Sequence, residues 1–296
     1  MKSARAFSPA KLNLFLAVTG RRPDGYHDLV SLATPLAWGD DLLAEETGGG
    51  FALECGDPGV PRDGTNLVFR AAEAFRAASG WRCGVRFILH KRIPVGAGLG
   101  GGSSNAVAAL RALNELAGGP LDETGLLEIA AGLGSDCPLF LNGGPVVLRG
   151  RGERIEPLPD KSAMRLRGRR VLLFKPGFEI STAGAYARLA EREGGAYLPP
   201  AEAERSLGCW LADSSAAAEE ILFNSFERPA FERFPALPVL LDRIRIRFGL
   251  VPHMSGSGSA CFALLPPAGG PAPHEIGAFV RDAWGPSALF VETRIA

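Results

Sequence analysis

A glycine-rich segment near the middle of the chain has the residue types that phosphate binding requires. Five glycines fall within residues 96–102, in the run Pro94, Val95, Gly96, Ala97, Gly98, Leu99, Gly100, Gly101, Gly102, Ser103, Ser104. Glycine lets backbone amides turn toward a phosphate without a Cβ clash. The apolar spacing of three and four that follows predicts a helix, whose amino end attracts anions. We therefore predict that residues 94–104 bind the phosphates of a nucleotide.

The residues around these glycines argue against two common kinds of phosphate site. It is not a P-loop, because no Lys-Ser or Lys-Thr pair follows them. Gly96, Gly98 and Gly101 match the dinucleotide pattern GxGxxG. A Rossmann unit also needs an acidic residue about 20 positions later, at the end of a second strand. Here Asp122 stands at that distance, at the start of a predicted helix, so a dehydrogenase is the weaker interpretation.

Two charged residues could carry out phosphoryl transfer, which needs charge neutralisation and a group that accepts the hydroxyl proton. Asp136 is the candidate base, although an aspartate at a predicted helix start is as often a cap. Lys11 is the candidate cation, lowering the pKa of the acceptor hydroxyl or keeping Asp136 ionised. The alternative for Lys11 is a solvated lysine on a strand edge. Asn13 on the same strand face favours a site.

Aromatic residues after predicted turns could bind a planar base. Tyr26, His27 and Phe178 all occupy such positions. Their rings can stack on a base, and the Tyr26 hydroxyl and the His27 imidazole can also form hydrogen bonds with it. Taken singly, each residue is more often a packing residue.

Periodicity indicates the elements that must position these residues. Period-two alternation predicts strands at residues 11–18 and 85–89, and apolar runs mark further segments at 29–37, 171–174 and 260–265. Helices are predicted at 67–78, capped by Asn66, then at 106–116 and 122–133, with Pro138 in the first turn of another. Strands and helices mixed in both halves predict an α/β or α+β fold.

Length and composition suggest two domains in a chain of 296 residues. Apolar periodicity is lost over residues 157–170, so we place a boundary there and predict domains at 1–160 and 161–296. Residues 190–220 are rich in Ala, Glu and Gly, and we expect a flexible or poorly helical insertion.

The charge balance and the cysteines limit the partners and the compartment. Lys plus Arg and Asp plus Glu both number 32, which gives no electrostatic footprint for nucleic acid or an anionic membrane. No run approaches the ~18 apolar residues of a membrane span. The five cysteines lack CxxC spacing, which favours reduced thiols in the cytoplasm. We therefore expect a cytoplasmic protein with a small-molecule ligand, as a monomer or weak homodimer.

Three segments together resemble a known family. Residues 9–14 (PAKLNL), 94–106 (PVGAGLGGGSSNA) and 255–262 (SGSGSACF) resemble, in order and spacing, the three motifs of the GHMP small-molecule kinases. The resemblance implies transfer of phosphate from ATP, with Mg²⁺, to a hydroxyl of a small molecule. It also implies an α+β (mixed α/β) fold of two lobes, similar to ribosomal protein S5 domain 2 and to ferredoxin.

The resemblance implies a role for each matching residue. Asp136 would be the base, Lys11 the neighbouring cation, and Asn13 would orient the substrate. Residues 94–104 would bind the ATP phosphates, and Ser104 would help hold magnesium, directly or through water. Further binding residues would be Asn66 near the adenine, and Gly256, Ser257 and Gly258 over the substrate phosphates.

Within the family, residues 19–29 and 134–138 resemble members whose acceptor is a polyol linked to cytidine diphosphate. Tyr26 and Phe178 would then sandwich the cytosine, and His27 would read its polar edge. A mevalonate or homoserine kinase is the alternative, but those substrates carry no base to stack. A nucleotide sensor without catalysis is a further alternative, disfavoured because both Lys11 and Asp136 are present.

Overall fold

The chain divides into two compact units, each built from several segments. The computed structural model describes residues 2–191 and 197–296. Unit 1 comprises residues 1–10, 38–95 and 100–143, and unit 2 comprises residues 11–37, 96–99 and 144–296. Strands β1 (Ser3–Arg21) and β2 (His27–Thr47) contribute residues to both units. The predicted lobe boundary at residue 160 stays a prediction.

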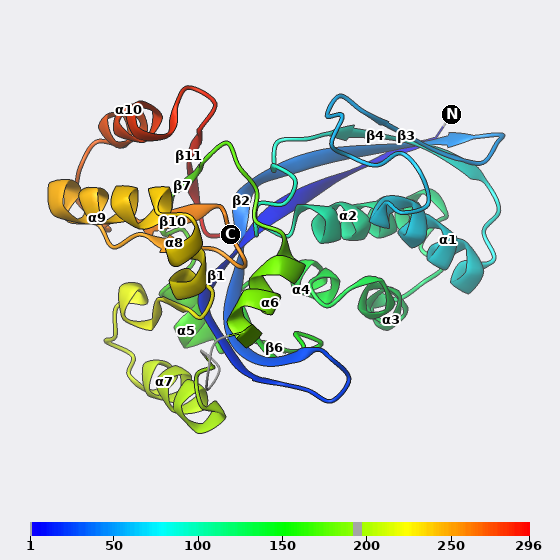
Figure 1. Cartoon of the computed structure of the whole chain (residues 1–296). Helices are drawn as coiled ribbons and strands as arrows, with labels where there is room; N and C mark the ends of the chain where they lie inside the picture. The colour runs from blue at the N-terminus through cyan, green and yellow to red at the C-terminus, as the bar shows by residue number, and fades with distance from the viewer. Residues whose placement is uncertain (1, 192–196) are drawn as a thin grey trace. The chain divides into compact units, whose positions relative to one another are not determined.

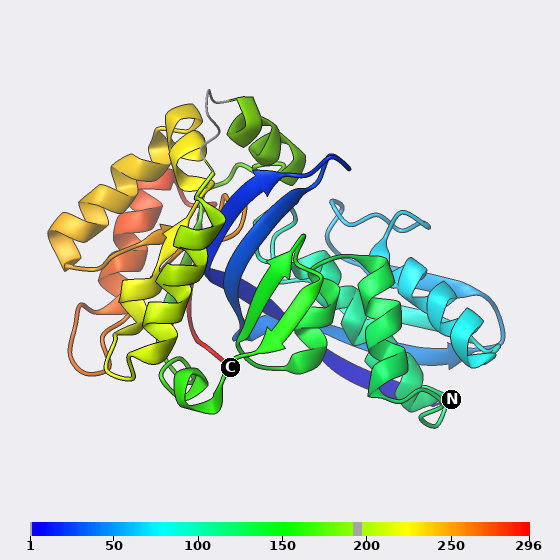
Figure 2. The same ribbon diagram turned by 90° about the horizontal axis from the view of Figure 1, so that it is seen from below.

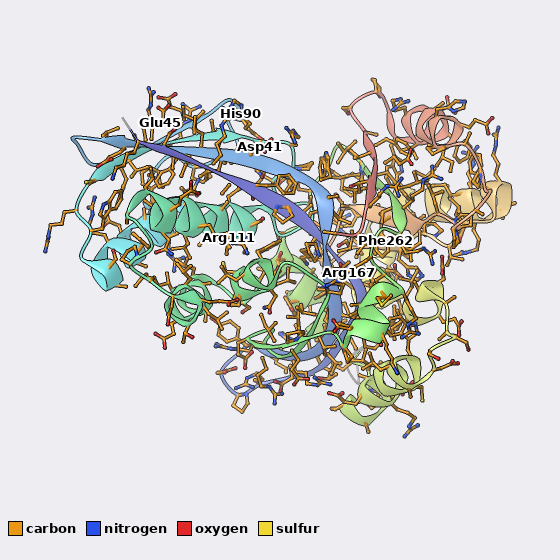
Figure 3. The ribbon with its side chains drawn as sticks, turned by 180° about the vertical axis from the view of Figure 1, so that it is seen from behind. Asp41, Glu45, His90, Arg111, Arg167 and Phe262 are labelled. Atoms are coloured by element: carbon orange, nitrogen blue, oxygen red, sulfur yellow. The ribbon has the colours of Figure 1, made fainter. Side chains whose placement is uncertain are left out.

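Unit 1 is a sheet with helices on one face. Strand β4 (Gly84–His90) pairs antiparallel with β2 and parallel with β3 (Phe51–Cys55). The helices are α1 (Leu67–Ser79), α2 (Gly101–Leu116), α3 (Glu123–Leu133) and α4 (Cys137–Asn142). Helices α1 and α2 lie along one side of the sheet (Figure 1), and Asp41, Glu45 and His90 project from the other (Figure 3).

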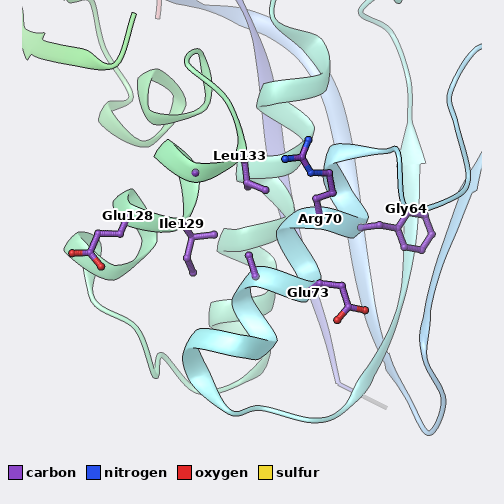
Figure 4. Close-up of a pocket in the computed structure, with 9 residues that line it drawn as sticks. Gly64, Arg70, Glu73, Glu128, Ile129 and Leu133 are labelled. Carbon is purple, nitrogen blue, oxygen red and sulfur yellow. The ribbon is translucent and has the colours of Figure 1, made fainter. Parts of the chain in front are cut away.

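The helices of unit 1 follow the predictions, with one shift. Asn66 caps α1, accepting a hydrogen bond from the Val68 amide at 2.9 Å, and Asp122 caps α3. Helix α2 begins at Gly101 rather than at residue 106, so residues 101–104 form its first turn. A cavity of about 530 Å³ is lined by residues of α1 and α3 and by Gly64, none of them a predicted site residue (Figure 4).

Unit 2 contains the rest of the first sheet and a second sheet. Strands β5 (Val146–Gly150), β6 (Arg154–Pro157) and β8 (Phe223–Asn224) extend the first. The second sheet is antiparallel in the order β11 (Leu289–Arg294), β7 (Arg170–Lys175), β10 (Cys261–Leu264), β9 (His253–Met254). The predicted mixture of strands and helices is therefore confirmed.

In the sequence, each described helix of unit 2 falls between two strands. They are α5 (Asp160–Met164), α6 (Thr182–Glu191), α7 (Pro200–Ala212), the 3-10 turn η1 (Ala218–Ile221), α8 (Glu227–Arg233), α9 (Ala236–Phe248) and α10 (Pro273–Trp284). Helices α9 and α10 lie side by side in both ribbon views (Figures 1 and 2). No described helix is both long enough and apolar enough to cross a membrane.

The prediction of a flexible or poorly helical insertion at 190–220 is wrong for residues 200–212. Helix α7 buries Ala203, Leu207 and Trp210, which recur at helical spacing. The guanidinium of Arg165 lies 3.9 Å from the centre of the Trp210 ring. Alanine and glutamate are strong helix formers, so this composition was compatible with a packed helix. Residues 192–196 lie outside the described residues.

Candidate active site

The residues that flank the glycine-rich segment on both sides form hydrogen bonds with one carboxylate in unit 1. We call residues 94–104 the N-terminal glycine loop. Asp40 on β2 is fully buried, and its Oδ1 accepts from the backbone amides of Arg92 at 2.6 Å and Ile93 at 2.8 Å. Its Oδ2 accepts from Lys91 Nζ at 2.5 Å and Asn105 Nδ2 at 2.8 Å. Burial of this charge is tolerated because it is paired and fully hydrogen-bonded.

The tip of the N-terminal glycine loop needs glycine for two reasons. Gly96, Gly98 and Gly100 have φ values of +63°, +77° and +69°, which other residues rarely adopt. A Cβ on Gly98 would lie 2.3 Å from the carbonyl oxygen of Ser255. We call residues 255–258 the C-terminal glycine loop. The tip, residues 96–99, therefore packs backbone to backbone against it inside unit 2.

Lys11 lies at this junction of the two glycine loops. Its backbone amide donates to the carbonyl of Leu99 at 3.0 Å, and its Nζ donates to Asn13 Oδ1. A Cβ built on Gly256 would stand 3.3 Å from Lys11 Nζ. Only 5% of Lys11 is exposed, so the interpretation of a solvated edge lysine is wrong. Asn13 is equally buried and is held by Ser31 Oγ at 2.9 Å, so it orients the ammonium.

Asp136 precedes helix α4 in unit 1. It occupies the N-cap position, but its half-buried side chain forms no capping hydrogen bond with that helix. Helix capping therefore does not explain this aspartate. Asp136 and Lys11 belong to different units, and their cooperation stays a prediction.

Ser104, in the first turn of α2, is the residue that fits a magnesium ion bound with nucleotide. Its Oγ is buried and has no hydrogen-bond partner among the described residues, which is rare for a buried hydroxyl. No described cluster of His, Cys, Asp or Glu is arranged to hold a metal. Magnesium is commonly bound through substrate phosphates and water with few protein ligands. The donor set is compatible with that mode.

His27 belongs to an aromatic cluster in unit 2. Its ring stacks on Tyr186 with 4.7 Å between centroids, and Tyr197 lies at 5.9 Å. Its Nε2 is buried and has no hydrogen-bond partner within the described part of the chain. Burial, and then the charge of Arg21, lowers the pKa of the imidazole below its ordinary value, which keeps the ring neutral near pH 7.

Tyr186 was not identified from the sequence. The chain has only three tyrosines, and two of them contact His27, so their scarcity was the one available signal. Tyr186 also meets Phe226 edge-on at 4.8 Å, which places its ring firmly.

The other two predicted base-binding residues have separate partners. The exposed Tyr26 ring lies 4.7 Å from the Arg151 guanidinium, whereas Phe178 stacks on Phe234 at 5.1 Å. No contact between Tyr26 and Phe178 occurs among the described ring pairs. The roles of both in binding a base stay predictions.

The local structure accounts for the bonding of Asn66 and for the protonation of Cys137. Asn66 caps α1 and donates from Nδ2 to the Pro61 carbonyl at 2.7 Å, so its role near adenine stays a prediction. Burial raises the pKa of Cys137 to about 11, so its thiol is protonated at neutral pH and is a poor nucleophile.

The chain is similar to kinases of small molecules. The family model for the GHMP kinases N terminal domain matches residues 66–144. A 4-diphosphocytidyl-2-C-methyl-D-erythritol kinase of Thermotoga maritima is 42% identical over 270 residues, covering 89% of this chain and 93% of that protein.

Solved structures of small-molecule kinases also match the chain. A crystal structure of 4-(cytidine 5'-diphospho)-2C-methyl-D-erythritol kinase matches with a TM-score of 0.76 and 36% identity, over 99% of this chain and 100% of the other. Homoserine kinase from Cytophaga hutchinsonii matches with a TM-score of 0.74 over 100% of this chain and 95% of the other. Its identity is 18%, so this match shows the shared fold alone.

Proposed function

The chain belongs to the family of 4-diphosphocytidyl-2-C-methyl-D-erythritol kinases, and we propose that it phosphorylates the 2-hydroxyl of that substrate with ATP. The products are ADP and the 2-phosphate, an intermediate of the methylerythritol phosphate (non-mevalonate) route to isoprenoid precursors. The observation that carries the proposal is the buried ammonium of Lys11 beside the two glycine loops.

The transfer follows from charge and position. The hydroxyl oxygen attacks the γ-phosphorus, the bond to the β,γ-bridging oxygen breaks, and ADP leaves with that electron pair. Asp136 accepts the hydroxyl proton. Lys11 lowers the pKa of the attacking hydroxyl and stabilises the negative charge that develops on its oxygen. Because the N-terminal glycine loop lacks the lysine of a P-loop, this positive charge has to come from elsewhere.

The remaining phosphate contacts are assigned by residue type. Amides of residues 94–104 and the amino end of α2 bind the ATP phosphates, and Gly256, Ser257 and Gly258 lie over the substrate phosphates. Magnesium, when bound, supplies further neutralisation of the phosphate charge, and Ser104 helps hold it, directly or through water. Asn13 fixes the Lys11 ammonium on one side and orients the substrate.

The cytosine is assigned to the aromatic residues of unit 2. His27 Nε2 is the atom offered to the polar edge of the base, because the neutral ring leaves it able to donate or accept. Tyr26 and Phe178 remain the proposed stacking residues, and the Tyr186 ring against His27 is an additional one. A mevalonate or homoserine substrate would give these rings no base to contact.

We also propose a cytoplasmic location and a monomer or weak homodimer. All five cysteines are free thiols, which suits a reducing compartment.

The proposal is tested by measuring ADP release from ATP and Mg²⁺ with 4-diphosphocytidyl-2-C-methyl-D-erythritol. Asp136→Asn removes the base, and kcat is expected to fall by about 10²–10⁴-fold. Asp122→Asn is the matched control, because Asp122 caps α3 and asparagine caps a helix equally well.

Each outcome has a distinct meaning. Unchanged turnover in Asp136→Asn removes Asp136 as the base but keeps the kinase. No ADP release by the wild type contradicts the substrate, and mevalonate and homoserine are then tried. Binding of ATP without turnover on any alcohol would instead indicate a sensor.

A further inference from the structure

A single buried amide holds the C-terminal glycine loop. Asn224, the last residue of β8, is 4% exposed. Its Nδ2 donates to the carbonyls of Met254 at 2.7 Å and Gly256 at 2.9 Å, and its Oδ1 accepts from the Phe226 amide at 2.9 Å. Because two partners are carbonyls and one is an amide, the orientation of the Asn224 side chain is determined.

The backbone that Asn224 holds is the part of the loop nearest to Lys11. A Cβ on Gly256 would lie 2.8 Å from the Gly98 carbonyl oxygen and 3.3 Å from Lys11 Nζ. Ser255 Oγ donates to the Gly98 carbonyl at 3.3 Å and accepts from the Asn13 amide at 3.4 Å. A shift of residues 254–256 would therefore move the immediate surroundings of the Lys11 ammonium.

A second contact secures the entry to this loop independently. Glu227 Oε1 accepts from the Met254 amide at 2.7 Å and pairs with His253 Nδ1 at 3.0 Å. It does not reach Gly256 in the described hydrogen bonds. Loss of the Asn224 amide should therefore leave the Met254 amide held by Glu227, while the Met254 carbonyl and the loop beyond it are released.

We infer that Asn224 is a positioning residue for phosphoryl transfer, fixing residues 254–256 and so the spacing between Lys11 and the two glycine loops. This inference rests on the proposed function for its kinetic consequence. Its structural consequence, restraint of the C-terminal glycine loop, holds whatever the acceptor is.

Asn224→Asp is the sharpest test. The aspartate keeps the size of the side chain and the bond from the Phe226 amide, but it sets an oxygen without a hydrogen against two carbonyls. A displacement of about 1 Å in a reacting group can lower the rate about 10²-fold. We expect kcat to fall about 10- to 100-fold, and KM for the acceptor to rise as well, because residues 256–258 lie over its phosphates in the proposed site.

Asn114→Asp is the matched control. The Asn114 side chain donates to the Leu121 carbonyl at 2.9 Å and accepts from the Leu121 amide at 3.1 Å, in the connection between α2 and α3. It loses one amide-to-carbonyl bond in the same way, and kcat is expected to stay at the wild-type value. Thermal unfolding of both variants gives the folded fraction at the assay temperature.

Hydrogen exchange of the glycine loops supplies a readout that needs no substrate. Peptides covering residues 94–104 and 253–258 should exchange faster in Asn224→Asp than in the wild type, and not in Asn114→Asp. Unchanged exchange overturns the inference even if the wild type fails to phosphorylate the proposed substrate. Unchanged kcat in an active enzyme, or a loss that only follows the unfolded fraction, also overturns it.

Discussion

The two glycine loops are anchored by opposite kinds of chemistry. The N-terminal loop has its ends tied to Asp40, a fully buried carboxylate that carries an ion pair with Lys91. The C-terminal loop is tied to Asn224, a neutral amide. Breaking a buried ion pair leaves an unpaired charge, at a cost of about 3–5 kcal/mol. Removing a neutral donor leaves unsatisfied carbonyls, which cost about 1–3 kcal/mol.

Loss of each anchor should therefore affect a different property, stability in one case and the geometry of the site in the other. Loss of the charged anchor should affect folding first, because the side chain of Lys91 is only 6% exposed and its uncompensated ammonium is poorly hydrated. Loss of the neutral anchor should leave the fold and disturb the geometry around Lys11.

Asp40→Ala should lower the free energy of unfolding by about 3–5 kcal/mol, because the Lys91 ammonium and three other donors lose their acceptor. Denaturant unfolding measures the change. The matched control is Asp41→Ala, whose side chain is 48% exposed and pairs with Arg92 on the surface. That variant should lose less than about 1 kcal/mol. Equal losses at positions 40 and 41 would refute the buried charge as the source.

Gly98→Ala should destabilise the protein by about 1–3 kcal/mol and reduce kcat/KM for ATP. The added methyl group meets the Ser255 carbonyl at 2.3 Å, and the φ of +77° is unfavourable for alanine. Calorimetric unfolding and steady-state kinetics measure the two effects.

The control for Gly98→Ala is Gly208→Ala in α7, where an added Cβ meets nothing within 4 Å. It should stabilise the helix by up to about 1 kcal/mol and leave kcat unchanged. If both glycines tolerate alanine, close packing of the two loops is not required.

Adding Lys91→Met to Asp40→Asn should recover about 1–2 kcal/mol of the stability that Asp40→Asn loses. Asparagine can still accept from the Arg92 and Ile93 amides, so two penalties remain, the lost bond from Asn105 Nδ2 and the unpaired ammonium of Lys91, and Lys91→Met removes the second. A double-mutant cycle by denaturant unfolding measures the recovery. No recovery would mean that geometry, rather than charge, makes Asp40 important.

Much of the local structure was predictable from the sequence. Asn66 and Asp122 cap their own helices, and both bonds join residues two or three positions apart. The alternation of Val85, Phe87 and Leu89 predicted strand β4 with one buried face. Helix α7 was missed because its apolar positions are few within an Ala- and Glu-rich stretch.

The site was only partly predictable. The N-terminal glycine loop and Lys11 were identified by residue type and order, which also carried the family resemblance. Tyr186 and Asp40 were missed because nothing near them in the chain signals their partners. Asp40 bonds to residues 51 to 65 positions away.

The sequence by itself determined the features that depend on neighbours in the chain: helix caps, strand period, and the positive φ angles that require glycine. Only the tertiary structure decided that Lys11 is buried, that Gly98 meets Ser255, and that Asn224 holds Gly256. The physical reason is that burial and hydrogen bonding between distant segments depend on which groups the packed chain brings together, and residue type alone does not specify that pairing.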